Sequence, residues 1–186
     1  MLPSGFVGGF LYPFQFMDFM EEVSIDFAFK KFRPESCVFV ISVDGEGKPN
    51  GMVAGWNMAC ASEPPMFAVS LWKGGNTNQL IRKSGEFVVA VPNKELEKEV
   101  EFFGTTHGNH VDKFKETGIE TAKARHVKPP LIRKATINLE CKLEKEVQAG
   151  DHIIFIGRVL AAHVNQEKKV LLNMGKKGGK RIFREF

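Results

Sequence analysis

The stretch ATINLECKLEKEV, from Ala135 to Val147, alternates apolar and polar side chains and is the clearest strand signal in the sequence. Successive side chains of a β-strand point to opposite faces, so residues two apart share a face. One face carries the apolar set Ala135, Ile137, Leu139, Cys141, Leu143 and Val147. The other carries the polar set Thr136, Asn138, Glu140, Lys142, Glu144 and Glu146. The pattern predicts one buried and one solvent-exposed face, which is typical of an antiparallel sheet.

A second long strand is predicted at His152–Val164, directly after a tight turn at Gly150 and Asp151. Its opening residues, HIIFI, place apolar side chains on both faces, so both faces need to be covered. Together the two strands favour a mainly β protein, with an antiparallel sheet or barrel and small helices inserted in its middle.

Four further strands are predicted from β-branched and aromatic runs at Ser36–Val43, Gly51–Trp56, Met66–Trp72 and Glu86–Val91. The first two form a hairpin around DGEGKPN, a turn between strands and therefore not a Rossmann phosphate loop. Thr77 is a plausible N-cap for a short helix that ends near Gly85. Lys94–Phe103 has the apolar spacing of an amphipathic helix.

Composition excludes several classes of protein. The 186 residues suffice for one domain with a sizeable core. The net charge of +4 is too mild to indicate nucleic-acid binding, and no apolar run approaches the roughly 18 residues of a membrane span. The three cysteines Cys37, Cys60 and Cys141 are scattered, which favours a reducing compartment, so we expect a cytoplasmic protein.

The two ends of the chain stand apart from this pattern. Residues 1–20 form an apolar arm that lacks the basic region and cleavage site of a signal peptide. Either the natural start lies near Met17 or Met20, or the arm packs on the surface of a single domain formed by residues 21–186. The basic C-terminal stretch GKKGGKRIFREF is expected to be a solvated terminus, with a role near an anionic ligand or partner as the alternative.

Three stretches carry candidate chemistry, each with a plainer alternative. His107 and His110 in HGNH lack a partner stretch rich in metal ligands, so a solvated loop is favoured over a metal site. The small residues between Asn50 and Pro65 would let backbone N–H groups approach a ligand, although local physics alone favours a connecting loop. His152 either donates to a ligand or pairs with Asp151.

Four segments, in this order and spacing, resemble the flavin reductase-like, FMN-binding split-barrel family. They are NGMVAGWNMACASEPP, NTNQLIRKSGEFVVAVP, FFGTTHGNHVDKF and LECKLEKEVQAGDHIIFIGRV, and the resemblance covers about Phe32 to Val164. It implies an antiparallel Greek-key split β-barrel with a few short peripheral helices. It also implies a homodimer with FMN near the subunit interface.

The resemblance assigns roles residue by residue. A segment cradling the flavin, largely through backbone groups, would comprise Trp56, Asn57, Met58, Ala59 and Cys60. Thr77 would meet the FMN phosphate, and Lys73 or Asn76 would substitute for an arginine that the family often has where Gly75 stands. His107 replaces a serine of the family's loop, and Lys113 is retained. The family's GDH motif ends in His152, the expected catalytic residue, which would donate to flavin or nicotinamide.

The implied activity is transfer of hydride from NAD(P)H to FMN, then of electrons to free flavin, a ferric complex or a partner protein. The alternative is a non-catalytic FMN-binding electron carrier like flavoredoxin. Neither role requires a metal, a nucleic acid or a membrane.

Overall fold

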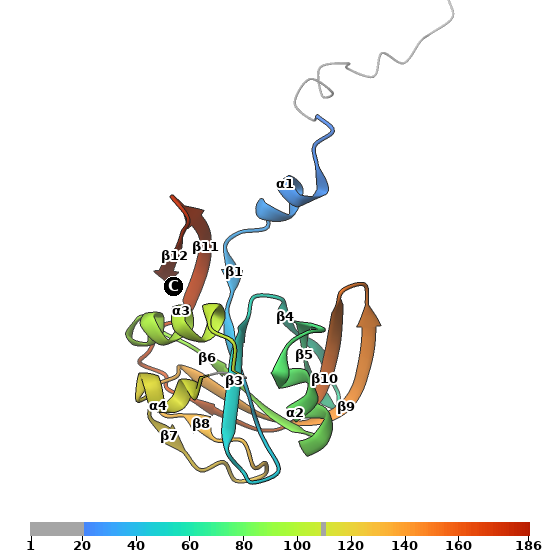
Figure 1. Ribbon diagram of the computed structural model, residues 1–186, viewed down its shortest axis with the longest axis vertical. Coiled ribbons are helices and arrows are strands. Elements are labelled where there is room, and N and C mark those ends of the chain that lie inside the picture. The colour runs from blue at the N-terminus through green and yellow to red at the C-terminus, as the bar shows by residue number, and fades with distance from the viewer. Residues whose placement is uncertain (1–20, 109–110) are drawn as a thin grey trace, which may run out of the picture. The chain divides into compact units, whose positions relative to one another are not determined.

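The computed structural model of the protein describes residues 21–108 and 111–186, so the predicted arm and His110 lie outside the described residues (Figure 1). The chain divides into two units, residues 1–32 and 33–186. In the first, Ser24 accepts a hydrogen bond from Phe27 N and caps α1 (Ile25–Lys30). All other elements belong to the second unit.

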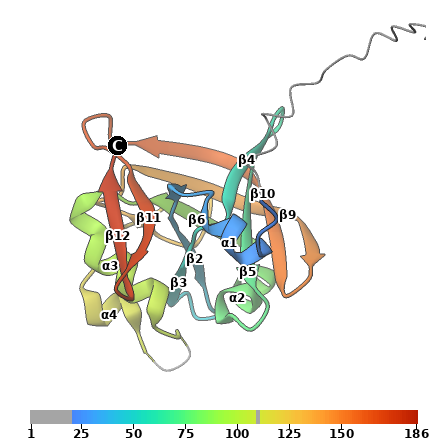
Figure 2. The ribbon, with the colours of Figure 1, turned by 90° about the horizontal axis from the view of Figure 1, so that it is seen from above.

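The main sheet has seven strands, all antiparallel, in the order β3-β2-β6-β9-β10-β5-β4. Their bounds are β2 (Val38–Val43), β3 (Pro49–Ala54), β4 (Asn57–Ser62), β5 (Pro65–Trp72), β6 (Glu86–Val91), β9 (Ile137–Ala149) and β10 (His152–Val164). The two edge strands, β3 and β4, are joined by only Gly55 and Trp56. The sheet therefore curls round on itself and stays open between them, with the long β9–β10 hairpin along one side (Figure 2).

The prediction of a connecting loop after the second strand is wrong. That strand ends at Ala54 rather than at Trp56, and the small residues of β4 pair with β5 as an edge strand. Side chains this small carry little strand propensity, so the pairing with β5 decides the conformation.

The basic C-terminal stretch is mostly exposed, as expected of a solvated terminus, but it forms an ordered hairpin that was not predicted. β11 (Leu171–Lys177) and β12 (Lys180–Glu185) form a hairpin, and β1 (Glu35–Ser36) pairs with the other edge of β11. The turn is Gly178–Gly179, whose φ angles of 58° and 81° suit a two-residue hairpin loop. A Gly-Gly pair between alternating residues is the sequence signal for this hairpin.

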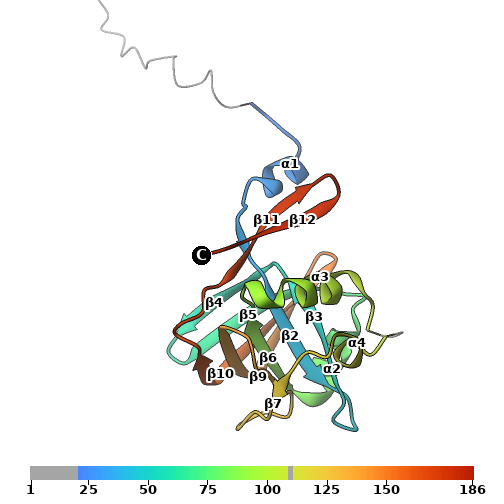
Figure 3. The ribbon, with the colours of Figure 1, turned by 90° about the vertical axis from the view of Figure 1, so that its left-hand side faces the viewer.

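Helices cover the barrel on two sides (Figure 3). They are α2 (Asn76–Ser84), the 3₁₀ turn η2 (Lys94–Leu96), α3 (Glu97–Thr105) and α4 (Lys113–Thr117). A small two-stranded sheet consists of β7 (Thr121–Ala122) and β8 (Leu131–Ile132). Within residues 21–108 and 111–186, no helix is long and apolar enough to cross a membrane.

The core lies on both faces of β2, whose residues are all buried. Phe39 and Ile41 belong to one apolar cluster, which includes Phe103 of α3, and the rings of Phe39 and Phe103 meet edge to face at 5.3 Å. Val38 and Val40 belong to a second cluster, which includes Phe87, Phe155 and Ile81 of α2. The period of two along the strand therefore divides the core between helix α3 and helix α2.

The prediction that the polar face of β9 is exposed to solvent is wrong at the start of the strand. Thr136, Asn138 and Glu140 are 4%, 6% and 0% exposed. Glu140 accepts hydrogen bonds from the backbone N–H groups of Arg125 and His126, and His163 Nε2 lies 2.7 Å from its carboxylate. The first half of β9 is covered on both sides, whereas its last residues are exposed on both, including Val147 of the predicted buried face. The polar groups of the first half are buried because each finds a partner.

Candidate functional site

One cavity brings together residues from three of the four segments that carry the family resemblance. Its volume is about 180 Å³, and it lies where β3, the start of α2 and the end of α3 meet. We call it the α2–α3 cavity; it is lined by Asn50, Gly51, Met52, Val53, Trp72, Gly75, Asn76, Thr77, Phe103, Gly104, Thr105, Thr106, His107, Gly108 and Lys113. Four of the predicted site residues are in this lining: Asn76, Thr77, His107 and Lys113.

The N-terminus of α2 opens onto this cavity without a side-chain cap. The N-cap is Gly75, so the prediction of Thr77 as N-cap is wrong by two positions. Because the helix begins earlier, the Thr77 hydroxyl has no capping role, and no hydrogen bond joins it to another described residue although Thr77 is only 3% exposed. Uncapped N–H groups and a hydroxyl at a helix N-terminus form a suitable site for an anion.

Asn78 adds a second unfilled polar group beside the same turn. Its Nδ2 donates to the carbonyl oxygen of Trp72 at 2.7 Å. Its buried Oδ1 has no hydrogen-bond partner among the described residues. A buried acceptor without a donor is destabilising, although Asn78 is not part of the lining of the α2–α3 cavity. Neither Asn78 nor Trp72 was predicted from the sequence, although Trp72 ends a strand just before Gly74 and Gly75.

Lys113 supplies a buried positive charge to the cavity. It is 3% exposed, and its Nζ donates to the carbonyl oxygens of Gly51 and Phe103, both at 3.0 Å. The ammonium also lies 5.5 Å from the centre of the Phe103 ring. No carboxylate of the described residues pairs with it, and burial lowers the pKa of Lys113 to about 8. An unpaired ammonium that is already held in place is prepared to receive an anion.

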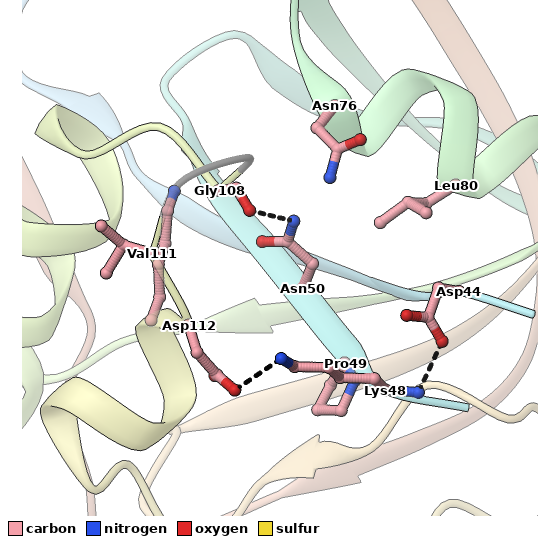
Figure 4. A pocket seen from close by; sticks show the side chains of 10 residues that line it. Asp44, Lys48, Pro49, Asn50, Asn76, Leu80, Gly108, Val111 and Asp112 are labelled. Carbon is pink, nitrogen blue, oxygen red and sulfur yellow. Dashed lines mark hydrogen bonds and ion pairs between the residues drawn. The ribbon is translucent and has the colours of Figure 1, made fainter. Parts of the chain in front are cut away.

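A second cavity of about 300 Å³ adjoins the first and shares Asn50, Asn76, Gly108 and Lys113 with it (Figure 4). We call it the Asp44 cavity; its other lining residues are Asp44, Lys48, Pro49, Leu80, Val111 and Asp112. Lys48 Nζ lies 2.9 Å from Asp112 Oδ2, and Asn50 Nδ2 donates to Gly108 O at 3.4 Å. These contacts tie the β2–β3 hairpin to the segment that precedes α4.

His152 is the first residue of β10 and lies outside both cavities. Its Nδ1 is 2.7 Å from Asp151 Oδ1, and this hydrogen bond holds the pKa of Asp151 below its usual value. Its ring contacts the Trp56 ring, with centres 4.8 Å apart and planes tilted by 40°. Across the β5–β10 ladder its partner is Trp72, which lines the α2–α3 cavity. The Trp56 and His152 rings are therefore in contact, and the ladder places His152 beside Trp72 at the edge of that cavity.

The predicted cradle from Trp56 to Cys60 forms edge strand β4 and lines neither cavity. Trp56 and Met58 are 52% and 61% exposed. The Asn57 amide is fully used, since its Nδ2 donates to backbone carbonyls and its Oδ1 accepts from Ser36 Oγ at 2.9 Å. Only backbone groups and open side chains of this segment are therefore available to a ligand.

Lys73 and the cysteines are not part of the lining of the α2–α3 cavity or the Asp44 cavity. Lys73 is exposed, and its backbone N–H donates to Asp151 O. Cys37 and Cys141 are buried, and burial raises the pKa of both thiols to about 12. Among the described residues, no group of histidines, cysteines and carboxylates has the arrangement of a metal site.

Comparison with known proteins follows the same segments. Residues 33–179 match the family described as flavin reductase like domain. The chain belongs to this family. A ferric-chelate reductase (NAD(P)H) of Archaeoglobus fulgidus is 29% identical over 137 residues, which cover 72% of this chain and 79% of that protein.

Solved structures of the family confirm the fold. The NADH:FAD oxidoreductase SgcE6 of Streptomyces globisporus C-1027 superposes with a TM-score of 0.76 and 25% identity, over 90% of this chain and 98% of that one. Flavoredoxin of Desulfovibrio vulgaris (Miyazaki F) superposes with a TM-score of 0.73 and 24% identity, over 83% and 87%. The predicted antiparallel split β-barrel with short peripheral helices is therefore confirmed.

Proposed function

We propose that this flavin reductase-like protein is an FMN-dependent oxidoreductase that takes hydride from NAD(P)H. The observation that carries the proposal is the α2–α3 cavity, where an uncapped helix N-terminus, the Thr77 hydroxyl and the Lys113 ammonium meet. These three groups fit the phosphate of FMN, which is mainly a dianion at neutral pH. Relatives named as a ferric-chelate reductase and an NADH-dependent FMN reductase support the same class of reaction.

The size of the cavity limits how a flavin would lie. Pockets for drug-sized ligands usually measure about 300–1,000 Å³, whereas the α2–α3 cavity measures about 180 Å³. The cavity would therefore hold the phosphate end and the adjoining polyol chain. The ring system would extend from Trp72 toward the contacting rings of His152 and Trp56.

In this arrangement the protein binds and orients, and bound FMN would accept hydride and pass electrons onward. Lys113 and Thr77 would hold the phosphate, and backbone groups of β4 would lie along the ring. His152, oriented by Asp151, would donate a hydrogen bond where negative charge develops on reduction. The electron acceptor would be free flavin, a ferric complex or a partner protein.

We further propose a homodimer that covers the ring. β4 is a largely exposed edge strand that carries Met58, and the exposed Trp56 directly precedes it. Exposed apolar side chains along an open strand edge are stabilised by a second subunit. Sedimentation of the FMN-loaded protein tests this directly. A stable 20.8 kDa monomer with one FMN would contradict the proposed dimer.

The decisive experiment is an absorbance spectrum of the protein mixed with FMN and freed of excess ligand, followed by stopped-flow reduction. We expect about one FMN per chain and rapid bleaching of the flavin band by NADH or NADPH. Retention of FMN without reduction by either nucleotide would favour an electron carrier reduced by another protein. Absence of FMN binding would contradict the proposal altogether.

A further inference from the structure

A third cavity, of about 270 Å³, lies between β1, β3 and the C-terminal hairpin, and the proposed function makes no use of it. We call it the β11–β12 cavity; it is lined by Arg33, Glu35, Cys37, Val53, Gly55, Asn173, Lys176, Arg181 and Phe183. Figure 1 shows β1 alongside β11 and β12, above α3. The lining brings together side chains that are more than a hundred residues apart in sequence.

The charges around this cavity are unbalanced. Its one carboxylate, Glu35, accepts hydrogen bonds from Arg33 Nη1 at 2.5 Å and from Asn173 Nδ2 at 2.7 Å. Lys176 and Arg181 form no ion pair with any residue in ranges 21–108 and 111–186. Two positive charges of the lining therefore remain without a counter-charge.

The hairpin places these two charges directly opposite each other. Lys176 and Arg181 are cross-strand partners of β11 and β12, and Lys177 and Lys180 form the next pair toward the turn. Like charges at opposing positions are destabilising. Side chains alternate between faces, so the pair Lys176–Arg181 lines the cavity whereas Lys177 and Lys180 do not. An anion in the cavity would remove the repulsion on the side that faces it.

Glycines allow the charged groups to approach this closely. Gly175 has a φ of 110°, and a Cβ there would lie 3.0 Å from Arg33 Cδ. It follows a shift of register between β11 and β12. A Cβ at Gly55 would lie 3.0 Å from Glu35 Oε1. The backbone is therefore shaped around the Arg33–Glu35 pair, which forms one wall of the cavity.

The β11–β12 cavity also borders the α2–α3 cavity. Val53 lines both. A Cβ added to Gly104, in the lining of the α2–α3 cavity, would lie 2.7 Å from Arg181 Nη1. The Arg181 guanidinium thus lies at the boundary between the candidate flavin site and the unbalanced basic cavity.

We propose that Lys176 and Arg181, with Arg33 beside them, bind a phosphate group of the nicotinamide dinucleotide donor. The site is distinct from the one that holds the FMN phosphate, and its assignment to the donor rests on the proposed reductase function. A guanidinium binds two phosphate oxygens at once, and the neighbouring ammonium binds a third. A dinucleotide is long enough to place its phosphates here and its nicotinamide over a flavin that extends from the α2–α3 cavity.

The first test measures pyrophosphate binding to the FMN-loaded protein by calorimetry, without turnover, so that the α2–α3 cavity is already occupied. The variant K176Q/R181Q removes the charges that line the cavity, and K177Q/K180Q removes the same charge from the other face of the same hairpin. We expect K176Q/R181Q to weaken pyrophosphate binding at least tenfold and K177Q/K180Q to change it less than twofold. Equal losses would mean that only the net charge of the hairpin matters, and would overturn the proposal, as would absence of binding to the unmodified protein.

The second test uses the FMN-loaded enzyme and compares KM values for NADPH and NADH. A rise for NADPH alone in K176Q/R181Q assigns the 2′-phosphate, and a rise for both assigns the diphosphate. A change only in the KM of the electron acceptor would overturn the assignment to the donor. FMN content should stay at the level of the unmodified protein, so a failure to bind FMN would count against the proposed function and not against this site. If the double variant does not fold, Lys176→Gln alone tests the same prediction at an exposed position.

Discussion

The α2–α3 cavity and edge strand β4 both carry residues expected to bind a flavin, yet the two regions are built differently. Thr77 and Lys113 in the cavity are each 3% exposed, whereas Trp56 and Met58 beside or on β4 are 52% and 61% exposed. The cavity offers the buried Thr77 hydroxyl and a buried Lys113 ammonium that no carboxylate of the described residues pairs with. The strand offers backbone and open apolar surface.

This difference indicates which residues determine affinity for FMN and which determine the rate of its reduction. Groups that are buried and already oriented lose little freedom when a ligand arrives, so they contribute most to affinity. Exposed groups gain by being covered, and they are where a second substrate or subunit can approach. We therefore expect changes in the cavity to alter affinity for FMN and changes near β4 and His152 to alter the rate of its reduction.

The largest effect is expected from T77A/K113M. It removes a hydroxyl and an ammonium that would contact a dianion, and each such hydrogen bond contributes about 1.5–3 kcal/mol. FMN affinity should fall by about a hundredfold or more, measured by fluorescence titration. Lys73→Ala is the matched control, because Lys73 is a cation just before α2 that lines neither the α2–α3 cavity nor the Asp44 cavity. This variant should change FMN affinity less than threefold.

Two outcomes would contradict the assignment of the FMN phosphate to Thr77 and Lys113. An equal loss in Lys73→Ala would assign the phosphate to the exposed lysine, and unchanged affinity in T77A/K113M would remove the phosphate from the cavity. Because Lys113→Met leaves the Gly51 and Phe103 carbonyls without their donor, thermal unfolding of the variant has to be measured alongside.

The next largest effect is expected at His152, near β4. His152→Ala should slow reduction of bound FMN by NAD(P)H about tenfold to a hundredfold, the size of one hydrogen bond lost in the transition state. FMN content should fall much less, since His152 lines neither cavity. Stopped-flow rates normalised to bound FMN make the measurement. A normal rate with lowered stability would leave His152 as a strand-end partner of Asp151 and favour the electron carrier.

Most strands were predictable because their signal is local. The β2–β3 hairpin, β5, β6 and the long β9–β10 pair follow from β-branched runs, alternation and turn residues. What failed depended on contacts distant in sequence. The sequence pattern predicts Glu140 as a solvent-facing residue of an alternating strand. The backbone N–H groups of Arg125 and His126, together with the His163 imidazole, make its burial possible.

Several residues of the candidate site could be predicted from the sequence, but the cavity that brings them together could not. Asn76, Thr77, His107 and Lys113 were named from the resemblance, and the fold brings them to one cavity. Asn78 was missed because an orphaned Oδ1 becomes visible only when its surroundings are known. The β11–β12 hairpin was not predicted, because the many basic residues around Gly178–Gly179 are also typical of a solvated terminus.

A smaller effect is expected from a change in pH. As pH rises, FMN affinity should fall while the stability of the FMN-free protein rises. Burial lowers the pKa of Lys113 from 10.5 to about 8, so its charge is lost as pH rises through about 8. FMN affinity should fall about fivefold between about pH 7 and pH 9, while the phosphate stays a dianion. Between about pH 8 and pH 10.5 the unfolded chain binds more protons at this lysine, so FMN-free protein should become more stable as pH rises.

Lys113→Met is the control for both trends, since it has no charge to lose. The variant should show a flat FMN affinity over this range and no rise in the stability of the FMN-free protein attributable to this site. If the unmodified protein instead becomes less stable from about pH 8 upward, with the variant behaving identically, another group dominates and Lys113 is not the titrating cation of the cavity.

The smallest effect separates the two tryptophans that flank His152. Trp72 lines the α2–α3 cavity, whereas Trp56 lies outside it and contacts the His152 ring at 4.8 Å. An aromatic pair of this kind contributes about 0.5–1.5 kcal/mol, so Trp56→Ala should lower the reduction rate about threefold through a less well-held imidazole. Its FMN affinity should change less than that of Trp72→Ala, which removes a wall of the cavity. Titration and stopped-flow reduction of both variants decide the point: a greater loss of affinity in Trp56→Ala would mean that β4, and not the cavity, anchors the flavin.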